Sequence, residues 1–251
     1  EGIMCNAQMS QRQVMKFLFE VSWEVCNKVG GIYTVIQSKL SSMIKAFGEN
    51  CLLIGPSLDH NTDFVDTQDA FFEPFRESIT KKGIQCRYGR WLVNGEPKVI
   101  LVDYRNYYDV TKLLFQFWSD FGVDSYSAQW DYIEPVLFST ACGEIIEIIN
   151  QHKKNDTLTS IAHFHEWMCG GGLLYLKKHA PDIGTVFTTH ATTLGRSLAS
   201  HSKNFYSELE GVHPEEAAKI HHVLPKHSME KIAAKESDCF TTVSDITAIE
   251  S

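Results

Sequence analysis

The sequence has no stretch approaching the ~18 consecutive apolar residues that a transmembrane helix needs. Residues 1–13 also lack the basic segment followed by an apolar segment that is typical of a secretory signal peptide. Both absences argue against a membrane-bound or secreted protein. We therefore expect a cytoplasmic protein with no membrane partner.

Positive charge is scarce as well. The 251 residues include 23 Lys and Arg against 31 Asp and Glu, for a formal net charge of −8. Nucleic acids and anionic membranes are usually bound by a basic surface, so the charge balance argues against both as partners. A small anionic ligand is still compatible, because a helix amino terminus and one or two lysines can form a local positive site.

The sequence lacks any Cys-x-x-Cys pair, although it contains seven cysteines. Several of them lie in apolar runs, such as Cys51 before residues 52–54. This arrangement is typical of reduced thiols that pack as small hydrophobic side chains in a cytosolic protein. We predict no disulfide framework.

Apolar residues, by contrast, are present in ordinary amount: 43% of the chain, with 22% charged residues. These values are typical of a folded globular protein with one large domain or two small ones. Strand and helix patterns alternate along the chain, most regularly in its last third. The alternation predicts right-handed β-α-β units, and hence an α/β fold with a mainly parallel sheet.

The expected elements follow from apolar periodicity and turn residues. Strands are predicted at 14–19, 51–54, 87–93, 98–102, 161–164, 185–188 and 239–243, and helices at 32–47, 135–150, 170–179 and around 229–233. Asn94-Gly95 predicts a hairpin between the third and fourth strands. Residues 104–130 are expected to be irregular or helical, and 200–225 to form a surface excursion.

Polar residues directly after strands are the best candidates for a site, because ligands of parallel α/β sheets bind beyond the carboxyl ends of the strands. We expect these residues to line one edge of the sheet: Lys28 with Gly30-Gly31, His165 with Glu166, His190, and Ser244. Arg196, six residues after His190, could reach the same crevice and pair with a phosphate. A surface salt bridge is the alternative for Arg196.

Lys28 and the two glycines precede a predicted helix. Backbone N–H groups and the helix dipole at such a position favour a phosphate. The pattern matches neither the dinucleotide-binding nor the Walker motif. A plain glycine turn with a solvated lysine remains open as a second interpretation.

Glu166 lies between His165 and Trp167, and a carboxylate beside an aromatic ring suits a sugar. A helix-start glutamate with a core tryptophan is the alternative. His163 and His165 could form a metal pair, but no third ligand has matching spacing, so we predict no metal. His190 could bind or polarise a ligand from the end of its strand, or it could be structural.

Six segments of the sequence together resemble the animal and fungal glycogen synthase family. They are the run Phe19-Glu20-Val21-Ser22-Trp23-Glu24 continuing to Val35, Leu53-Ile54-Gly55-Pro56, Gly89-Arg90-Trp91-Leu92, His163-Phe164-His165-Glu166-Trp167, the run from Thr188 to Arg196, and the run from Phe240 to Glu250. They occur in the family's order across residues 19–250. As a set they are highly specific.

The resemblance implies a glycosyltransferase-B architecture, with residues 1–251 as its amino-terminal, acceptor-side Rossmann-like domain and a second, nucleotide-binding Rossmann domain beyond 251. It implies transfer of glucose from UDP-glucose to the 4-hydroxyl at a glucan non-reducing end, with retention of configuration and without a metal. By motif matching, Lys28 lies near the diphosphate, His190 near the donor glucose, Arg196 at another donor contact, and Glu166 on the acceptor side.

The resemblance also implies glycogen or maltooligosaccharide as acceptor, glycogenin as a protein partner, a homo-tetramer, and a glucose-6-phosphate site outside this segment. A piece ending at residue 251 is expected to be inactive alone. Residues 104–133 and 200–228 match the family poorly, including Pro225-Lys226-His227. These departures concern oligomer contacts and regulation more than the donor site.

Two alternatives remain open. The first is another enzyme of the same architecture, such as a bacterial-type synthase that uses ADP-glucose, although those enzymes usually carry Asp where this sequence has Glu166. The second is a non-catalytic glucan-binding or glycogenin-docking module, in which Trp91, Trp130 and Trp167 would stack on sugars.

Overall fold

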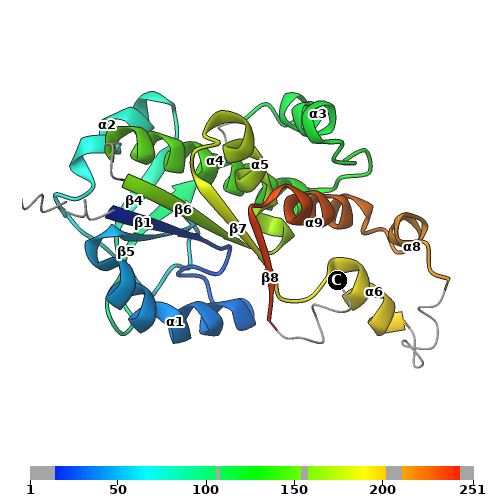
Figure 1. Ribbon diagram of the computed structural model, residues 1–251, viewed down its shortest axis with the longest axis horizontal. Helices are drawn as coiled ribbons and strands as arrows, with labels where there is room; N and C mark the ends of the chain where they lie inside the picture. The colour runs from blue at the N-terminus through cyan, green and yellow to red at the C-terminus, as the bar shows by residue number, and fades with distance from the viewer. Residues whose placement is uncertain (1–14, 106–107, 154–157, 202–210, 244–251) are drawn as a thin grey trace, which may run out of the picture.

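The computed structural model describes residues 15–105, 108–153, 158–201 and 211–243. One eight-stranded sheet runs through the molecule in the order β3-β4-β5-β2-β1-β6-β7-β8, with helices on both faces (Figure 1). The six strands from β5 to β8 in this order are parallel, and β3 and β4 are antiparallel additions at one edge. The predicted α/β, Rossmann-like fold is confirmed.

The strands are β1 Met15–Val21, β2 Cys51–Pro56, β3 Phe64–Asp66, β4 Gln85–Trp91, β5 Lys98–Asp103, β6 Leu158–His165, β7 Gly184–Thr189 and β8 Cys239–Thr242. The helices are α1 Gly31–Phe47, α2 Glu73–Lys81, α3 Val110–Phe121, α4 Trp130–Lys153, α5 Gly170–His179, α6 Thr193–His201, α8 Pro214–Ile220 and α9 Leu224–Glu236. Every predicted strand and helix is present, and Val14 alone of the predicted strand residues lies outside the described ranges. β3, α2, α6 and α8 were not predicted, and α3 lies in residues 104–130, which were expected only to be irregular or helical.

The hairpin predicted at Asn94-Gly95 joins β4 to β5 as expected. Glu96 N–H donates to the Val93 carbonyl at 3.0 Å, which closes a four-residue turn. Gly95 has φ +90°, a conformation that favours glycine and is required at the third position of a type II turn. The glycine signal in the sequence therefore marked the turn correctly.

Helix α4 begins five residues earlier than predicted. The prediction took Pro135 as the first turn, but the structure places Pro135 inside the helix, which starts at Trp130. A proline near the amino end of a 24-residue helix removes one backbone hydrogen bond and leaves the rest of the ladder intact. Even this helix is not apolar and long enough to span a bilayer, and neither is any other helix in the described ranges.

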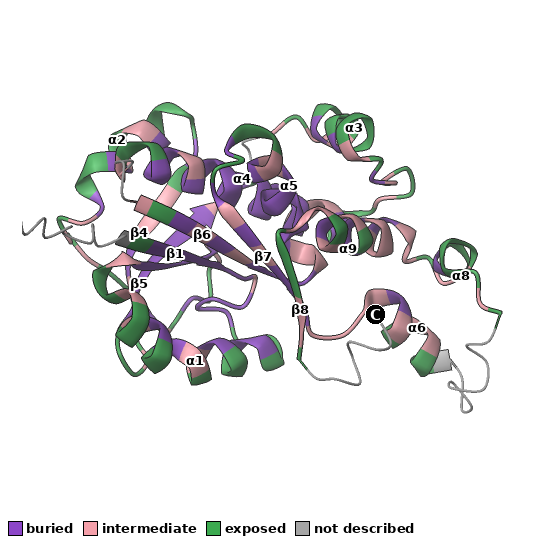
Figure 2. Ribbon diagram, viewed as in Figure 1, coloured by how far each residue is buried: buried purple, intermediate pink, exposed green. Residues whose placement is uncertain are grey.

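Two hydrophobic cores lie on opposite faces of the sheet. Phe17, Phe19 and Val21 of β1 point to one face, where α2, α4, α5 and α9 cover the strands. Leu18 points to the other face and packs with α1. Strand alternation assigns the residues to the two faces. In Figure 2 the central strands β1 and β6 are largely buried between the helices, whereas the edge strand β8 is exposed.

The strand order reverses beside β1. The chain goes from β1 to β2 on one side, and after β5 it returns through α4 to β6 on the other side. The switch point of the sheet is therefore between β1 and β6. In open parallel sheets, ligands bind in the crevice at the carboxyl ends of the strands at this point.

Candidate active site

The carboxyl ends of β6 and β7 bring three of the candidate residues into contact. His165 Nδ1 lies 2.9 Å from His190 Nε2. Glu166 Oε1 accepts hydrogen bonds from the backbone N–H of His190 at 2.8 Å and of Ala191 at 3.2 Å. Arg196 Nη2, at the start of α6, lies 3.6 Å from the same Glu166 oxygen. Ser244, expected at the same edge, lies outside the described residues.

Glu166 is held in an uncommon conformation at the end of β6. Its φ is +66°, in a region that non-glycine residues rarely adopt. Its backbone N–H donates to the Thr188 carbonyl at 2.9 Å, and its side chain is 3% exposed. Burial raises the pKa of the Glu166 carboxyl, although the N–H groups of His190 and Ala191 and the charge of Arg196 act in the opposite direction. The carboxylate ties the end of β6 to the turn that follows β7.

His190 is half-buried at the start of that turn. Burial, together with electrostatic repulsion from Lys39, His163 and Arg196, lowers the pKa of His190 to about 4. The imidazole is therefore neutral at neutral pH. Arg196, in contrast, is 62% exposed, so its guanidinium is accessible to an anion from solvent.

Lys28, Gly30 and Gly31 lie after β1, whose neighbour in the sheet is β6. All three are exposed, and Lys28 Nζ lies 5.8 Å from the centre of the Tyr33 ring. Because β1 and β6 are parallel, this loop emerges at the same edge as Glu166. The structure thus places the loop at the switch point, on the side opposite the His190 turn.

The amino terminus of α1 already holds a carboxylate from its own chain. Glu24 Oε2 accepts from the backbone N–H of Gly30 at 3.0 Å and of Tyr33 at 2.8 Å. The Gly30 N–H is thus bonded within the chain, and a role of Gly30 in binding the donor stays a prediction. Gly30 serves another need: a Cβ at this position would lie 2.8 Å from Glu24 Oε1. A Cβ on Gly31 would meet nothing within 4 Å, so Gly31 alone faces open space.

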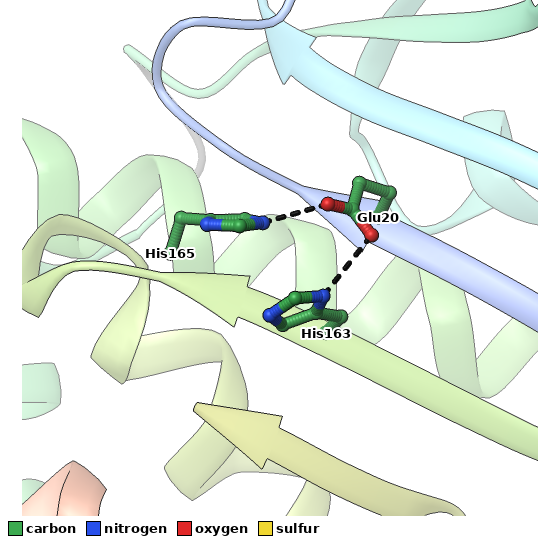
Figure 3. Close-up of side chains that lie close together, drawn as sticks. All are labelled: Glu20, His163 and His165. Atoms are coloured by element: carbon green, nitrogen blue, oxygen red, sulfur yellow. Dashed lines mark hydrogen bonds and ion pairs between the residues drawn. The ribbon is translucent and has the colours of Figure 1, made fainter. Parts of the chain in front are cut away.

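Next to the contact of His165 with His190 lies a cluster of Glu20, His163 and His165, in which Glu20 and His165 are buried and His163 is partly exposed (Figure 3). Glu20 Oε1 lies 2.6 Å from His165 Nε2, and Glu20 Oε2 lies 3.2 Å from His163 Nδ1. The sequence argument that His163 and His165 had no third partner is wrong, because Glu20 comes from a strand 145 residues away from His165. The only sequence signal was an acid inside an apolar strand.

Lys39 of α1 supplies the positive charge of this cluster. Its ammonium forms an ion pair with Glu20 and lies 3.3 Å from His163 Nδ1 and 3.4 Å from His165 Nε2. A divalent cation bound by the three side chains would compete with this ammonium for the same carboxylate. The absence of a metal in the chemistry stays a prediction.

The protonation states within the cluster follow from burial and contacts. Burial opposes ionisation of Glu20, but electrostatic attraction and hydrogen bonds from the His163 and His165 rings outweigh it and hold the pKa of Glu20 well below its ordinary value. Burial lowers the pKa of His165 to about 4, against the opposing effect of Glu20. A charged carboxylate thus faces a neutral His165.

A second buried acid, Glu230 of α9, holds the beginning of α6. It accepts from Thr189 Oγ1 at 3.0 Å and from the backbone N–H of Thr193 at 2.9 Å. Burial raises the pKa of Glu230 to about 7, and the charge of Glu166 adds to the effect. Since α6 carries Arg196, this contact positions the exposed cation. Sequence reasoning placed α9 by its apolar face and missed the acid on it.

The tryptophans considered for sugar stacking differ in exposure. Trp91 is fully buried and donates Nε1–H to Asp63 at 2.6 Å, so its proposed stacking role is wrong. Trp167 stacks on Tyr132, with ring centres 5.8 Å apart. Trp130 is 54% exposed. Only Trp130 offers a largely free ring.

Comparisons with known proteins agree with these observations. A family model described as Glycogen synthase matches residues 20–251. The liver glycogen [starch] synthase of Rattus norvegicus is 37% identical over 241 residues, which cover 93% of this chain and 34% of the relative. Isoform 2 of the Saccharomyces cerevisiae glycogen [starch] synthase is 36% identical over 262 residues, covering 96% and 36%. The Neurospora crassa glycogen [starch] synthase is 35% identical over 257 residues, covering 99% and 36%. The chain thus spans about a third of the length of these relatives.

Proposed function

The chain belongs to the glycogen synthase family, and we propose that it forms the acceptor-side domain of an enzyme that transfers glucose from UDP-glucose to a glucan. The acceptor would be the 4-hydroxyl at a non-reducing end, and the α configuration would be retained. A second Rossmann-like domain beyond residue 251 would complete the cleft. The observation that carries the proposal is the contact of His165 and Glu166 with His190, at the edge that carries the switch point between β1 and β6.

Charge complementarity supports the proposed substrate. Glucosyl transfer from a nucleotide sugar builds positive charge at the anomeric carbon and negative charge on the departing diphosphate, so preorganised groups are needed at both ends. Lys28 and Arg196 are exposed cations on the two sides of the switch point, suited to the diphosphate. Gly31 leaves its backbone open to an approaching ligand.

A neutral His190 suits the sugar end of the donor. A charged imidazole would repel the developing positive charge, whereas a neutral ring and the backbone beside it can accept hydrogen bonds from hydroxyl groups. Its low pKa keeps the ring neutral throughout the physiological range. We propose that His190 contacts the donor glucose.

In this proposal Glu166 acts mainly by holding the turn that carries His190 in position. Its Oε1 accepts two backbone hydrogen bonds from the turn that carries His190. A 3%-exposed carboxylate has little surface left for an acceptor sugar. Glu166 would therefore hold the His190 turn in place beside the acceptor path, and its loss would misplace the reacting groups.

The remaining features rest on the family alone. We propose a cytoplasmic enzyme that acts on glycogen or maltooligosaccharides, pairs with glycogenin as primer, and assembles as a homo-oligomer. A stand-alone glucan-binding module has one supporting observation, the exposed ring of Trp130. Calorimetry with maltooligosaccharides tests this second function by comparing their affinity for the unsubstituted chain with their affinity for the Trp130→Ala variant.

The test of the main proposal uses the full-length native protein. With UDP-glucose as donor, we expect His190→Ala to lower kcat by roughly 100- to 1000-fold, the scale seen when a preorganised active-site group is removed. Lys28→Ala should mainly raise KM for the donor. ADP-glucose should be a poor substrate.

The control for this test is His152→Ala, on the distant end of α4, where the side chain contacts Ser78. It should leave the kinetics unchanged. Wild-type kinetics of both the His190 and the Lys28 variants, or equal use of ADP-glucose, would show that the proposed site or donor is wrong.

A further inference from the structure

Three side chains form a continuous line from the buried cluster to the candidate site. Glu20 Oε1 lies 2.6 Å from His165 Nε2, and His165 Nδ1 lies 2.9 Å from His190 Nε2. The side chains of Glu20 and His165 are each 1% exposed, whereas His190 is half-buried. His165 Nε2 lies closest to Glu20 Oε1, with the Lys39 ammonium farther away at 3.4 Å, and His165 Nδ1 and His190 Nε2 face each other.

The inner end of the line accepts hydrogen bonds and cannot donate them. Glu20 forms an ion pair with the Lys39 ammonium and receives His163 Nδ1 on its second oxygen at 3.2 Å. His163 in turn is held through Nε2 by Thr188 Oγ1 at 2.6 Å. The ion pair with the Lys39 ammonium keeps Glu20 ionised, in line with its lowered pKa. An ionised carboxylate has acceptor sites only.

The direction of every hydrogen bond in the line follows from this. His165 must carry its proton on Nε2 to reach Glu20. Burial keeps the His165 ring neutral, so its Nδ1 has a lone pair and no proton. The contact with His190 is then possible only if His190 Nε2 carries the proton and donates it. In a neutral ring the remaining nitrogen, Nδ1, is left as an acceptor.

We propose that Glu20 and His165 are positioning residues that hold His190 in a single tautomer, with the proton on Nε2 and the Nδ1 lone pair turned away from the cluster. The hydrogen bond also fixes the plane of the ring. His190 would then offer a hydrogen-bond acceptor to a ligand, and it would select a hydroxyl donor at this point. This last consequence rests on the proposed function; the tautomer itself does not.

The arrangement explains why the buried Glu20 and His165 lie behind the half-buried His190. A single apolar side chain behind His190 would leave both tautomers and several ring orientations available. The line of hydrogen bonds removes that freedom before a ligand binds, which is the physical content of preorganisation. The parallel arm through His163 leads to Thr188 and on to Thr241, away from His190, so it provides a matched control.

The first experiment is NMR on this chain without ligand, with ¹⁵N-labelled histidine and with His190 assigned by the loss of its signals in His190→Gln. We expect a proton bound to His190 Nε2 that shows a coupling across the hydrogen bond to His165 Nδ1. A proton bound to His165 Nδ1 overturns the proposal. So does an Nε2–H of His190 that exchanges with solvent as fast as that of an exposed histidine.

The second experiment compares two variants of equal size. In His165→Phe the Nε2–H of His190 should exchange at least about 10-fold faster, because its acceptor is gone. In His163→Phe it should stay protected. Equal exchange in the two variants would show that His165 does not position His190. If His165→Phe does not fold, the coupling measured in the unsubstituted chain decides the question alone.

The third experiment measures the consequence in the full-length enzyme. His165→Phe should lower kcat by roughly 10- to 100-fold, the scale seen for partners that orient a functional histidine, with a smaller change in KM for the donor. An unchanged kcat in an otherwise active enzyme would show that the fixed tautomer has no functional role. An enzyme inactive with every sugar nucleotide would instead contradict the proposed function and leave the NMR result standing.

Discussion

The two halves of the sheet differ on the face that α1 approaches. Around β1, β2 and β5, the side chains on this face are apolar, and they pack against α1: Leu18, Cys51, Leu53, Val99 and Leu101. From the end of β1 through β6 and β7, the same face carries Glu20, His163, His165 and Thr188. The change takes place within β1, between Leu18 and Glu20.

The comparison shows how one sheet can serve two purposes. In the apolar half, burial of side chains supplies stability without directional requirements. In the polar half, each buried group depends on a specific partner, and removing one member leaves the others unsatisfied. The first half holds the fold together, and the second holds a few atoms in fixed positions at the switch point.

The largest effect should come from breaking the apolar half. Trp91→Ala removes a fully buried ring beside Tyr33 and its hydrogen bond to Asp63. We expect the free energy of unfolding to fall by about 3–5 kcal/mol, as for other buried aromatic residues. The loss should be the same at pH 5 and pH 8. Chemical denaturation at both values measures it.

The control for this prediction is Trp118→Ala on α3, where the ring is 59% exposed. It should change the free energy of unfolding by no more than about 0.5 kcal/mol. A loss below about 1 kcal/mol in Trp91→Ala would contradict the assignment of Trp91 to the core.

The polar half should make the free energy of unfolding depend on pH in the acid range. His165 has a pKa of about 4 in the folded chain and an ordinary value of 6.5. Between these values the unfolded chain binds more protons than the folded chain, so stability is lost as the pH falls from 6.5 towards 4. The difference corresponds to at most about 3 kcal/mol.

Urea unfolding from pH 7 to pH 4.5 measures this loss. His165→Gln should flatten the curve, because the amide does not titrate. His152→Gln should leave the slope unchanged, since that side chain lies at the far end of α4. An identical slope in the unsubstituted chain and in His165→Gln would contradict a neutral, buried His165.

Glu230 should give a smaller effect of the opposite sign. Its pKa is about 7 in the folded chain, above its ordinary value of 4.5. Between these values the folded chain holds the extra proton, so stability falls as the pH rises through the window. Glu230→Gln removes this loss but weakens the bond to Thr193 N–H, for a net gain of about 1–2 kcal/mol at pH 8.

The same variant should be close to neutral at pH 4.5, where Glu230 is protonated anyway. Thermal or chemical unfolding at pH 4.5 and pH 8 makes the comparison. Glu215→Gln, on exposed α8, is the control and should not gain stability at the higher pH. The stability of Glu230→Gln is compared with that of the unsubstituted chain at each pH. If this difference is less favourable to the variant at pH 8 than at pH 4.5, the raised pKa is contradicted.

The smallest effect separates the two glycines of the β1 loop. Gly30→Ala would push the Glu24 carboxylate off the start of α1, at a cost of about 1 kcal/mol, the usual value of a helix cap. Gly31→Ala meets no neighbour and should stay within about 0.5 kcal/mol. Equal losses in the two variants, measured by chemical denaturation, would contradict the capping role of Glu24.

Much of the fold could be predicted from the sequence. Three local signals are repeated by the structure: the short, mostly apolar segments at 161–164 and 185–188, the three-and-four spacing in 32–47, and the Asn94-Gly95 turn. The missed elements lack such signals. β3 has only three residues, which is too few to show a period. α3 does have apolar residues at helical spacing, but they lie in an aromatic-rich stretch that the prediction left as irregular or helical.

The candidate site was predictable only in outline. Placing His165, Glu166 and His190 after parallel strands was enough to bring them to one edge. The same reasoning could not find Glu20, which reads as a charge in an apolar strand, nor Lys39 on the inner side of α1. Nor could it show that Glu24, six residues before Gly30, accepts hydrogen bonds at the start of α1, because that contact depends on the path of the loop.

The sequence by itself determined which residues form strands and helices and which strand ends carry polar groups, because periodicity and turn chemistry act between near neighbours. Only the tertiary structure decided which polar groups meet. Glu20 faces His163 through the register of β1 against β6, and Lys39 reaches them from α1. These contacts join segments more than a hundred residues apart, and a one-residue slip in register would turn Glu20 to the opposite face.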